Sequence, residues 1–233
     1  MEETSGGEFR VTRQSGLPRL MLVSDRHRTR GRNLVTVIAD AVDGGVGIVQ
    51  LREPGLADDE LIDLVRRVRR VVPAGTEIVV NGRPDVAATT RSGLHVPADS
   101  EPSAERCEGV REQGLLYGRS VLEGSDGGAV LAEQVSYLLV GPLGSNSSET
   151  GHPGCSPDRV REISRRVRPI PVFAGGKVTA AGVPGLIHAG AYGVAVCEGI
   201  LSANHPRRVA QALVLALEVA TAAGQHHGPD RLF

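Results

Sequence analysis

Eight short apolar runs, separated by longer amphipathic stretches, restrict the fold of this chain more than any other feature. Each run is nearly continuously apolar and rich in Val, Ile and Leu, which is typical of parallel strands covered on both faces. The runs lie at residues 20–23, 47–51, 77–80, 94–96, 115–118, 137–140, 171–174 and 193–196. Strands that alternate with helices form a parallel sheet, and eight such units in 233 residues predict the α/β class and a single (β/α)8 TIM barrel. A doubly wound open sheet is the alternative, but the first run does not lead into the GxGxxG turn of dinucleotide-binding sheets.

The stretches between the runs carry helix signals. Residues 58–72 place apolar side chains at helical spacing, with arginines on the other side. Ser156 followed by Pro157 is typical of a helix start, and Asn204 followed by Pro206 begins the last helix. We therefore expect every run to be followed by a helix.

Composition limits the domain organisation and the kinds of partner. The barrel is expected over residues 18–224, between a disordered N-terminal lead (1–17) and a flexible C-terminal tail (225–233). A formal net charge of -1 and an aromatic content of 3% argue against a nucleic-acid partner. No apolar stretch is long enough to cross a bilayer, so no membrane partner is expected. The three scattered cysteines indicate reduced thiols in a cytoplasmic protein, and a homo-oligomer is compatible with the sequence.

In a barrel of this kind the active site forms from the loops after the strands. Gln50 and Arg52 are two residues apart at the end of the second run, so both can point into the barrel mouth, the opening at the carboxyl ends of the strands. An inward arginine needs a partner, because an unpaired buried charge is costly. That partner is either a substrate phosphate or a carboxylate of the chain, Glu53 or Asp25.

A phosphate site is predicted after the last two runs. Gly175 and Gly176 follow the seventh run and Gly199 follows the eighth, where backbone N–H groups of such barrels often approach an anion. The alternative is that these glycines only turn a corner. Glu198 would repel an anion there unless Lys177 compensates.

Other signals are less specific. The hydroxyl-rich loop at residues 144–151 is either a mobile lid over a polar ligand or an idle surface loop. Ser120 has no nucleophile-elbow sequence around it, so no hydrolytic constellation stands out. Asp25, Asp85 and Asp99 carry oxygen ligands suited to Mg²⁺, but their spacing is unspecific.

Taken in order, these segments resemble the thiamin phosphate synthase family, including its thiazole tautomerase relatives. The resemblance covers about residues 19–214. Its strings are VSDR (23–26), GGVGIVQLRE (44–53), VNGRPDVA (80–87), GLHVP (93–97), GRSV (118–121), LLVGPL (138–143), GHP (151–153), PVFAGGK (171–177) and AGAYGVAV (189–196).

The resemblance implies a transferase that joins a pyrimidine methyl diphosphate to a thiazole phosphate and releases pyrophosphate with the help of Mg²⁺. Its ligands would be small phosphorylated molecules. Catalytic roles are implied for Arg52 and Ser120, with Ser120 beside the leaving group. Substrate binding is implied for Gln50, Arg52, Asn81, Asn146, Ser148, Gly175 and Gly176, and Asp99 is the candidate metal ligand.

Several positions depart from the family pattern. Pro54 stands where the family has a Lys, Gly82 replaces an acidic Mg²⁺ ligand, and Asp99 lies one place before the position of the second. Glu149 replaces a loop Lys and Glu198 replaces a Ser. These changes lower the positive charge or the metal affinity of the site.

Two alternatives to a synthase therefore stay open. One is a catalytically impaired paralogue that binds a small phosphorylated ligand. The other is an enzyme for a different, less anionic substrate. The tautomerase activity is less favoured, because Leu122 stands where those relatives carry a His.

Overall fold

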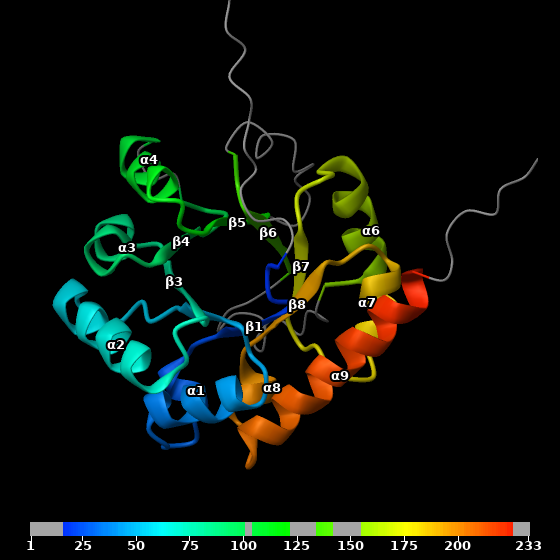
Figure 1. Ribbon diagram of the computed structural model, residues 1–233, viewed down its shortest axis with the longest axis horizontal. Coiled ribbons are helices and arrows are strands. Elements are labelled where there is room, and N and C mark those ends of the chain that lie inside the picture. Colours follow the sequence, from blue (N-terminus) through cyan, green and yellow to red (C-terminus); the bar gives the residue numbers. More distant parts are fainter. Residues whose placement is uncertain (1–15, 101–103, 122–133, 142–154, 226–233) are drawn as a thin grey trace, which may run out of the picture.

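The computed structural model describes residues 16–100, 104–121, 134–141 and 155–225, and these form a closed barrel of eight parallel strands (Figure 1). Each strand pairs in parallel with the next, and β8 closes the barrel against β1. The strands are β1 (Leu20–Val23), β2 (Ile48–Leu51), β3 (Glu77–Asn81), β4 (Gly93–Val96), β5 (Tyr117–Val121), β6 (Tyr137–Val140), β7 (Val172–Gly175) and β8 (Gly193–Val196). The predicted single (β/α)8 barrel is confirmed.

Helices surround the strands on the outside (Figure 1). They are α1 (Leu34–Asp43), α2 (Asp58–Val71), α3 (Pro84–Thr90), α4 (Ala104–Glu112), α6 (Pro157–Arg166), α7 (Val183–His188), α8 (Glu198–Leu201) and α9 (Pro206–Gln225). A short 3-10 helix, Arg26–Arg28, follows β1. No helix in the described ranges is both long enough and apolar enough to span a membrane.

Side chains at the helix ends explain where several helices begin. The Ser156 hydroxyl oxygen accepts a hydrogen bond from the Arg159 amide at 3.2 Å, which caps α6 as its sequence predicts. The Asn33 side chain caps α1 in the same way. Helix α2 has three acidic residues in its first turn and two arginines in its last, an arrangement that complements the helix dipole.

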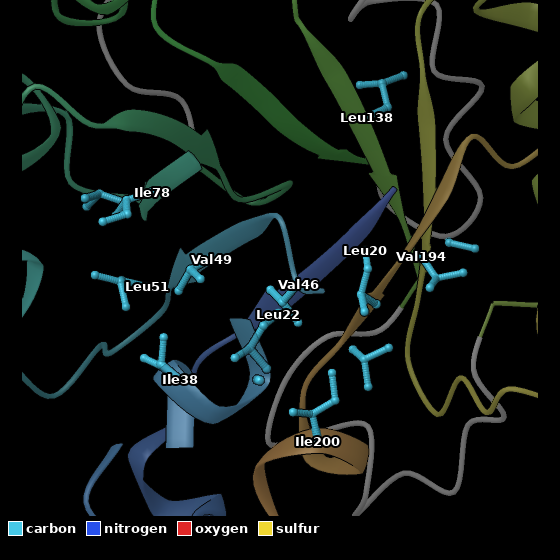
Figure 2. Packing of buried hydrophobic residues seen from close by; sticks show 14 of the residues in the cluster. Leu20, Leu22, Ile38, Val46, Val49, Leu51, Ile78, Leu138, Val194 and Ile200 are labelled. Carbon is cyan, nitrogen blue, oxygen red and sulfur yellow. The ribbon is translucent and has the colours of Figure 1, made fainter. Parts of the chain in front are cut away.

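Alternate residues of each strand face two different cores. Leu20 and Leu22 of β1 pack outward against the helices, whereas Met21 and Val23 point into the barrel. Figure 2 shows the outer core, in which strand residues lie beside Ile38 of α1. Because both strand faces are buried, nearly continuous apolar runs are required, and this is why the runs predict the barrel well.

Two aromatic rings fill the barrel interior by lying against glycines of neighbouring strands. A Cβ atom at Gly118 of β5 would overlap the Tyr137 ring of β6, and one at Gly193 of β8 would lie 2.8 Å from Cε1 of Phe173 of β7. The two rings meet edge to face, with centroids 5.5 Å apart. In the part of the chain that the structure describes, the interior is therefore a packed core, and polar side chains gather at its mouth.

Two features differ from the sequence-based expectation. Strand β5 lies at Tyr117–Val121 and not at residues 115–118, because Arg119 and Ser120 in its second half are polar and interrupt the apolar run. The short helix α8 begins directly after β8 and was not predicted.

Candidate active site

Polar side chains from neighbouring strands meet at the barrel mouth. On β2, Ile48 belongs to the inner core, so Gln50 and Arg52, two and four residues further along, lie on the same side of the chain. The Oε1 atom of Gln50 accepts a hydrogen bond from Nδ2 of Asn81 on β3 at 3.1 Å. The structure thus joins two of the predicted substrate-binding residues directly.

A buried line of contacts leads from this pair to Ser120 on β5. The Tyr137 hydroxyl is hydrogen-bonded to the side chain of Gln50 and lies 3.1 Å from Nδ1 of His95. On the other side of the imidazole, Nε2 of His95 lies 2.8 Å from the hydroxyl oxygen of Ser120. Gln50, His95 and Tyr137 are at most 1% exposed. Residues from five strands, β2 to β6, therefore form one polar network.

The imidazole of His95 is uncharged at neutral pH. Burial, and after it the positive charges of Arg119 and Arg52, together lower its pKa from about 6.5 to about 3. The influence of a charge on a pKa falls with distance, so the guanidinium groups of Arg119 and Arg52 both lie near the network. The phenol of Tyr137 is neutral too, since burial raises its pKa. The positive charge on this side of the mouth comes from arginines and not from the histidine.

The backbone before Arg52 is held by a buried serine and glutamate. The Ser24 hydroxyl donates to Oε1 of Glu53 at 2.6 Å and accepts from the Arg52 amide at 3.0 Å. The Glu53 carboxylate also accepts from the Arg26 amide at 3.2 Å, and burial raises the pKa of Glu53. Glu53 was one of the partners expected for Arg52. Its carboxylate is bonded to Ser24 and Arg26 instead, and the described residues form no ion pair between Arg52 and Glu53.

The opposite side of the mouth, between β8 and β1, is close to charge balance. Arg28 lies 3.3 Å from a carboxylate oxygen of Glu198 and 3.6 Å from one of Asp25. The pKa of Cys197, the residue that follows β8, is influenced by the charges of these three groups and of Arg52, so all four lie near this thiol. Burial, and after it the negative charge of Asp25, raise the pKa of the Cys197 thiol to about 12. Two guanidinium groups and two carboxylates thus share this region.

The glycine turn after β7 lies where the phosphate site was predicted. Gly175 is the last residue of β7, and Gly176 follows with a φ of +114°, a conformation that favours glycine. After β8 the chain enters α8, whose first residue is Glu198. Loops after the seventh and eighth strands together with a short extra helix are a frequent phosphate site in these barrels. Here a carboxylate lies at that corner.

Some predicted residues stay apart from this arrangement. Asn146, Ser148 and Glu149 lie outside the described residues. Asp99 is exposed, three residues beyond the end of β4. Within the described ranges no group of three His, Cys, Asp or Glu residues could hold a metal ion. These residues therefore do not form a magnesium site by themselves.

Sequence reasoning gave no role to three residues that the structure places in the site. His95 follows Gly93 at the inward spacing of two, and Tyr137 precedes the inward Leu139 by the same spacing, so strand parity was the available signal. Tyr137 looked like an ordinary member of an apolar run. No local signal marks Arg28, because its partner Glu198 is 170 residues away.

The fold and this arrangement define a single-domain (β/α)8 barrel with a polar site at the carboxyl ends of its strands. The family model described as thiamine monophosphate synthase matches residues 20–200, and the chain belongs to that family.

Individual relatives agree with this assignment. A putative thiamine-phosphate synthase of Geobacter sulfurreducens is 34% identical over 206 residues, covering 87% of this chain and 95% of that protein. A thiamine-phosphate synthase of Xanthobacter autotrophicus is 32% identical over 203 residues, covering 86% and 96%.

Solved structures agree on the fold. Thiamine phosphate pyrophosphorylase from Pyrococcus furiosus superposes with a TM-score of 0.74 at 22% identity, over 87% of this chain and 96% of that one. A 3-hexulose-6-phosphate synthase also superposes, with a TM-score of 0.67 at 18% identity. At these identities the likeness concerns the fold alone.

Proposed function

We propose that this protein is a transferase that joins a pyrimidine methyl diphosphate to a thiazole phosphate and releases pyrophosphate. A bond forms between the thiazole nitrogen and the pyrimidine's methylene carbon, while the carbon–oxygen bond to the diphosphate breaks and its electron pair leaves with pyrophosphate. Such a reaction needs positioning of two substrates and stabilisation of the departing charge.

The observation that carries the proposal is the joint placement of Gln50, Asn81 and Ser120 in one network beside Arg52. A guanidinium group suits diphosphate oxygens, because it presents several donors to an anion. We assign Arg52 to the diphosphate and Ser120 to the leaving oxygen. Gln50 and Asn81 would orient the diphosphate end of the pyrimidine substrate.

The remaining assignments follow the family resemblance. The Gly175–Gly176 turn would allow backbone N–H groups to approach the thiazole phosphate. Asn146 and Ser148 would contact the substrates from the loop after β6. Magnesium would supply neutralisation of the diphosphate charge when it is bound. Asp99 is the candidate ligand that the family resemblance gives, and no group of three His, Cys, Asp or Glu residues in the described ranges could hold a metal, so no step of this proposal depends on a protein-bound metal.

A second candidate function is binding of a phosphorylated ligand without turnover. The observation that favours it is the placement of Glu198 beside Arg28, because a carboxylate lies where the second phosphate would approach. Calorimetry with thiazole phosphate and with thiamin phosphate tests binding separately from the reaction.

The decisive experiment is a product assay. Purified protein is incubated with both phosphorylated precursors and Mg²⁺, and thiamin phosphate and pyrophosphate are quantified. Arg52→Ala and Ser120→Ala should each lower kcat/KM by about 10²–10³-fold, the usual effect of removing one electrostatic donor. Glu112→Gln, at the exposed end of α4, is the matched control and should leave the rate unchanged. Absence of product at micromolar enzyme and saturating precursors would exclude the synthase and leave the binding function.

A further inference from the structure

Ser120 and His95 lie close enough to resemble a nucleophilic pair. The distance of 2.8 Å between Ser120 Oγ and His95 Nε2 is that of a serine activated by a histidine base, with Tyr137 as the third group on Nδ1. In such a pair the serine donates its proton to the imidazole. Which group donates here is decided by the rest of the network.

The direction of the network begins at Asn81. Nδ2 of Asn81 donates to Oε1 of Gln50, so the carbonyl oxygen of this amide is already engaged. The Nε2 atom is the only donor of the Gln50 side chain, and it is left to face the Tyr137 hydroxyl and the sulfur of Met21, 3.7 Å away. We therefore assign Gln50 as the donor and the Tyr137 oxygen as the acceptor.

The direction then continues through Tyr137 to His95. With its oxygen already accepting from Gln50, the Tyr137 hydroxyl has its own hydrogen to place, and Nδ1 of His95 is 3.1 Å away. A neutral imidazole has one donor and one acceptor nitrogen. If Nδ1 accepts from Tyr137, the proton lies on Nε2, and Nε2 donates to Ser120.

This direction reverses the relation found in a nucleophilic pair. Ser120 Oγ accepts from His95, so its own hydrogen points away from the imidazole. His95 cannot take the serine proton, because the nitrogen that faces Ser120 is already protonated. The hydroxyl of Ser120 is thereby left as a donor toward the mouth, where Arg52 and Arg119 gather positive charge.

We propose that His95 and Tyr137 are positioning residues that hold Ser120 as a hydrogen-bond donor to the leaving diphosphate. The proposal rests on the function proposed above and deepens it, since it names residues that act through Ser120 without touching the substrate. In this arrangement Ser120 does not act as a nucleophile.

A double-mutant cycle in kcat tests this dependence. His95→Asn shortens the side chain and removes the donor at Nε2, and its kcat should fall about 10–100-fold with KM changed less than about threefold. His95→Gln places an amide nitrogen near the position of Nε2 and should recover at least about a fifth of the wild-type rate. In the Ser120→Ala background, His95→Asn should change kcat less than about twofold. Additive losses, or equal losses for Asn and Gln, would overturn the proposal.

Tyr137→Phe covers the case in which a His95 variant does not fold. The ring and its packing stay, and only the hydroxyl that directs Nδ1 is removed. Its kcat should fall about threefold to tenfold in the wild-type background and less than about twofold in the Ser120→Ala background. Thermal unfolding and circular dichroism confirm that each variant is folded before its rate is used.

A second measurement keeps the proposal separate from the synthase activity. The same cycle is repeated with the dissociation constant of pyrophosphate, measured by calorimetry on protein without turnover. His95→Asn should weaken binding about threefold to thirtyfold only when Ser120 is present. If wild type makes no thiamin phosphate but this cycle holds, the synthase assignment fails and the positioning role stands. Absence of pyrophosphate binding to wild type, or labelling of Ser120 by a fluorophosphonate, would overturn the positioning role itself.

Discussion

Replacement of Glu198 by Gln should strengthen the binding of phosphate-bearing ligands. Glu198 is 51% exposed and forms an ion pair with Arg28, whose side chain is 28% exposed, at the corner where the second phosphate is proposed to bind. An anion that approaches this corner competes with the Glu198 carboxylate for Arg28. It is also repelled by that carboxylate. The change to Gln removes both effects and keeps the shape of the side chain.

The magnitude follows from the exposure of the pair. Ion pairs as exposed as this one contribute about 0.2–1 kcal/mol. Repulsion between the carboxylate and a doubly charged phosphate, at a separation of roughly 6 Å in a water-like dielectric at physiological salt, adds about 0.5–1 kcal/mol. The sum, about 1–2 kcal/mol, corresponds to a roughly fivefold to thirtyfold gain in affinity.

Calorimetry with thiazole phosphate and with the unphosphorylated thiazole alcohol measures the effect. Glu198→Gln should lower the dissociation constant of the phosphate and leave that of the alcohol within about twofold of wild type. The gain should shrink at high salt, because exposed charges are screened. Glu112→Gln makes the same change of charge at the exposed end of α4 and should change neither constant. Equal affinity of wild type and Glu198→Gln for the phosphate at low salt would refute the placement of the phosphate at this corner.

Three further predictions concern the barrel itself. Gly118→Ala should lower the free energy of unfolding by about 1–3 kcal/mol in urea titrations, because the added methyl group overlaps the Tyr137 ring; an unchanged midpoint would contradict this packing. Cys197 should react with iodoacetamide at pH 8 at least about 100-fold more slowly than N-acetylcysteine, because burial and the nearby Asp25 raise its pKa to about 12 and little thiolate is present; comparable rates, followed by mass spectrometry, would count against that shift. Burial raises the pKa of Glu53, so the folded state holds this proton more tightly than the unfolded state does. The contribution of Glu53 to stability is therefore present below pH 4.5 and is lost as pH rises through the folded pKa. Glu53→Gln should remove that decline from the urea-derived stability between pH 4.5 and 7, and parallel profiles of the two proteins would show that Glu53 is not its source.

The fold was largely predictable because burial on both faces makes each strand apolar. The runs at 20–23, 137–140 and 193–196 coincide with β1, β6 and β8. The prediction for β5 was wrong because apolar runs end where the site begins. Ser120 is the last inward-facing residue of that strand and contacts His95, so its polarity comes from the site and not from packing, and the polar Arg119 beside it also interrupts the apolar run.

The site could be predicted only in part. Gln50 and Asn81 could be placed together because parallel strands bring their carboxyl ends to the same edge, and the structure joins them by a hydrogen bond. The network through His95 and Tyr137 could not be predicted, because it crosses from β4 to β6 inside the barrel and depends on the registers of three strands. The pair of Arg28 and Glu198 depends on closure of the barrel between β8 and β1.

The contacts between rings and glycines inside the barrel couple pairs of positions on adjacent strands. Tyr137 has room because Gly118 lacks a side chain, and Phe173 has room because of Gly193. Volume can therefore be exchanged between Gly118 and Tyr137 but not added at one of them alone. Gly193 does not allow such an exchange, because a Cβ atom there would also overlap the backbone oxygen of Arg19. Among related chains, we expect a larger residue at the first glycine wherever the tyrosine is lost, and a retained glycine at the second. A redesign of the barrel interior that ignores this exchange would overfill one strand while emptying its neighbour.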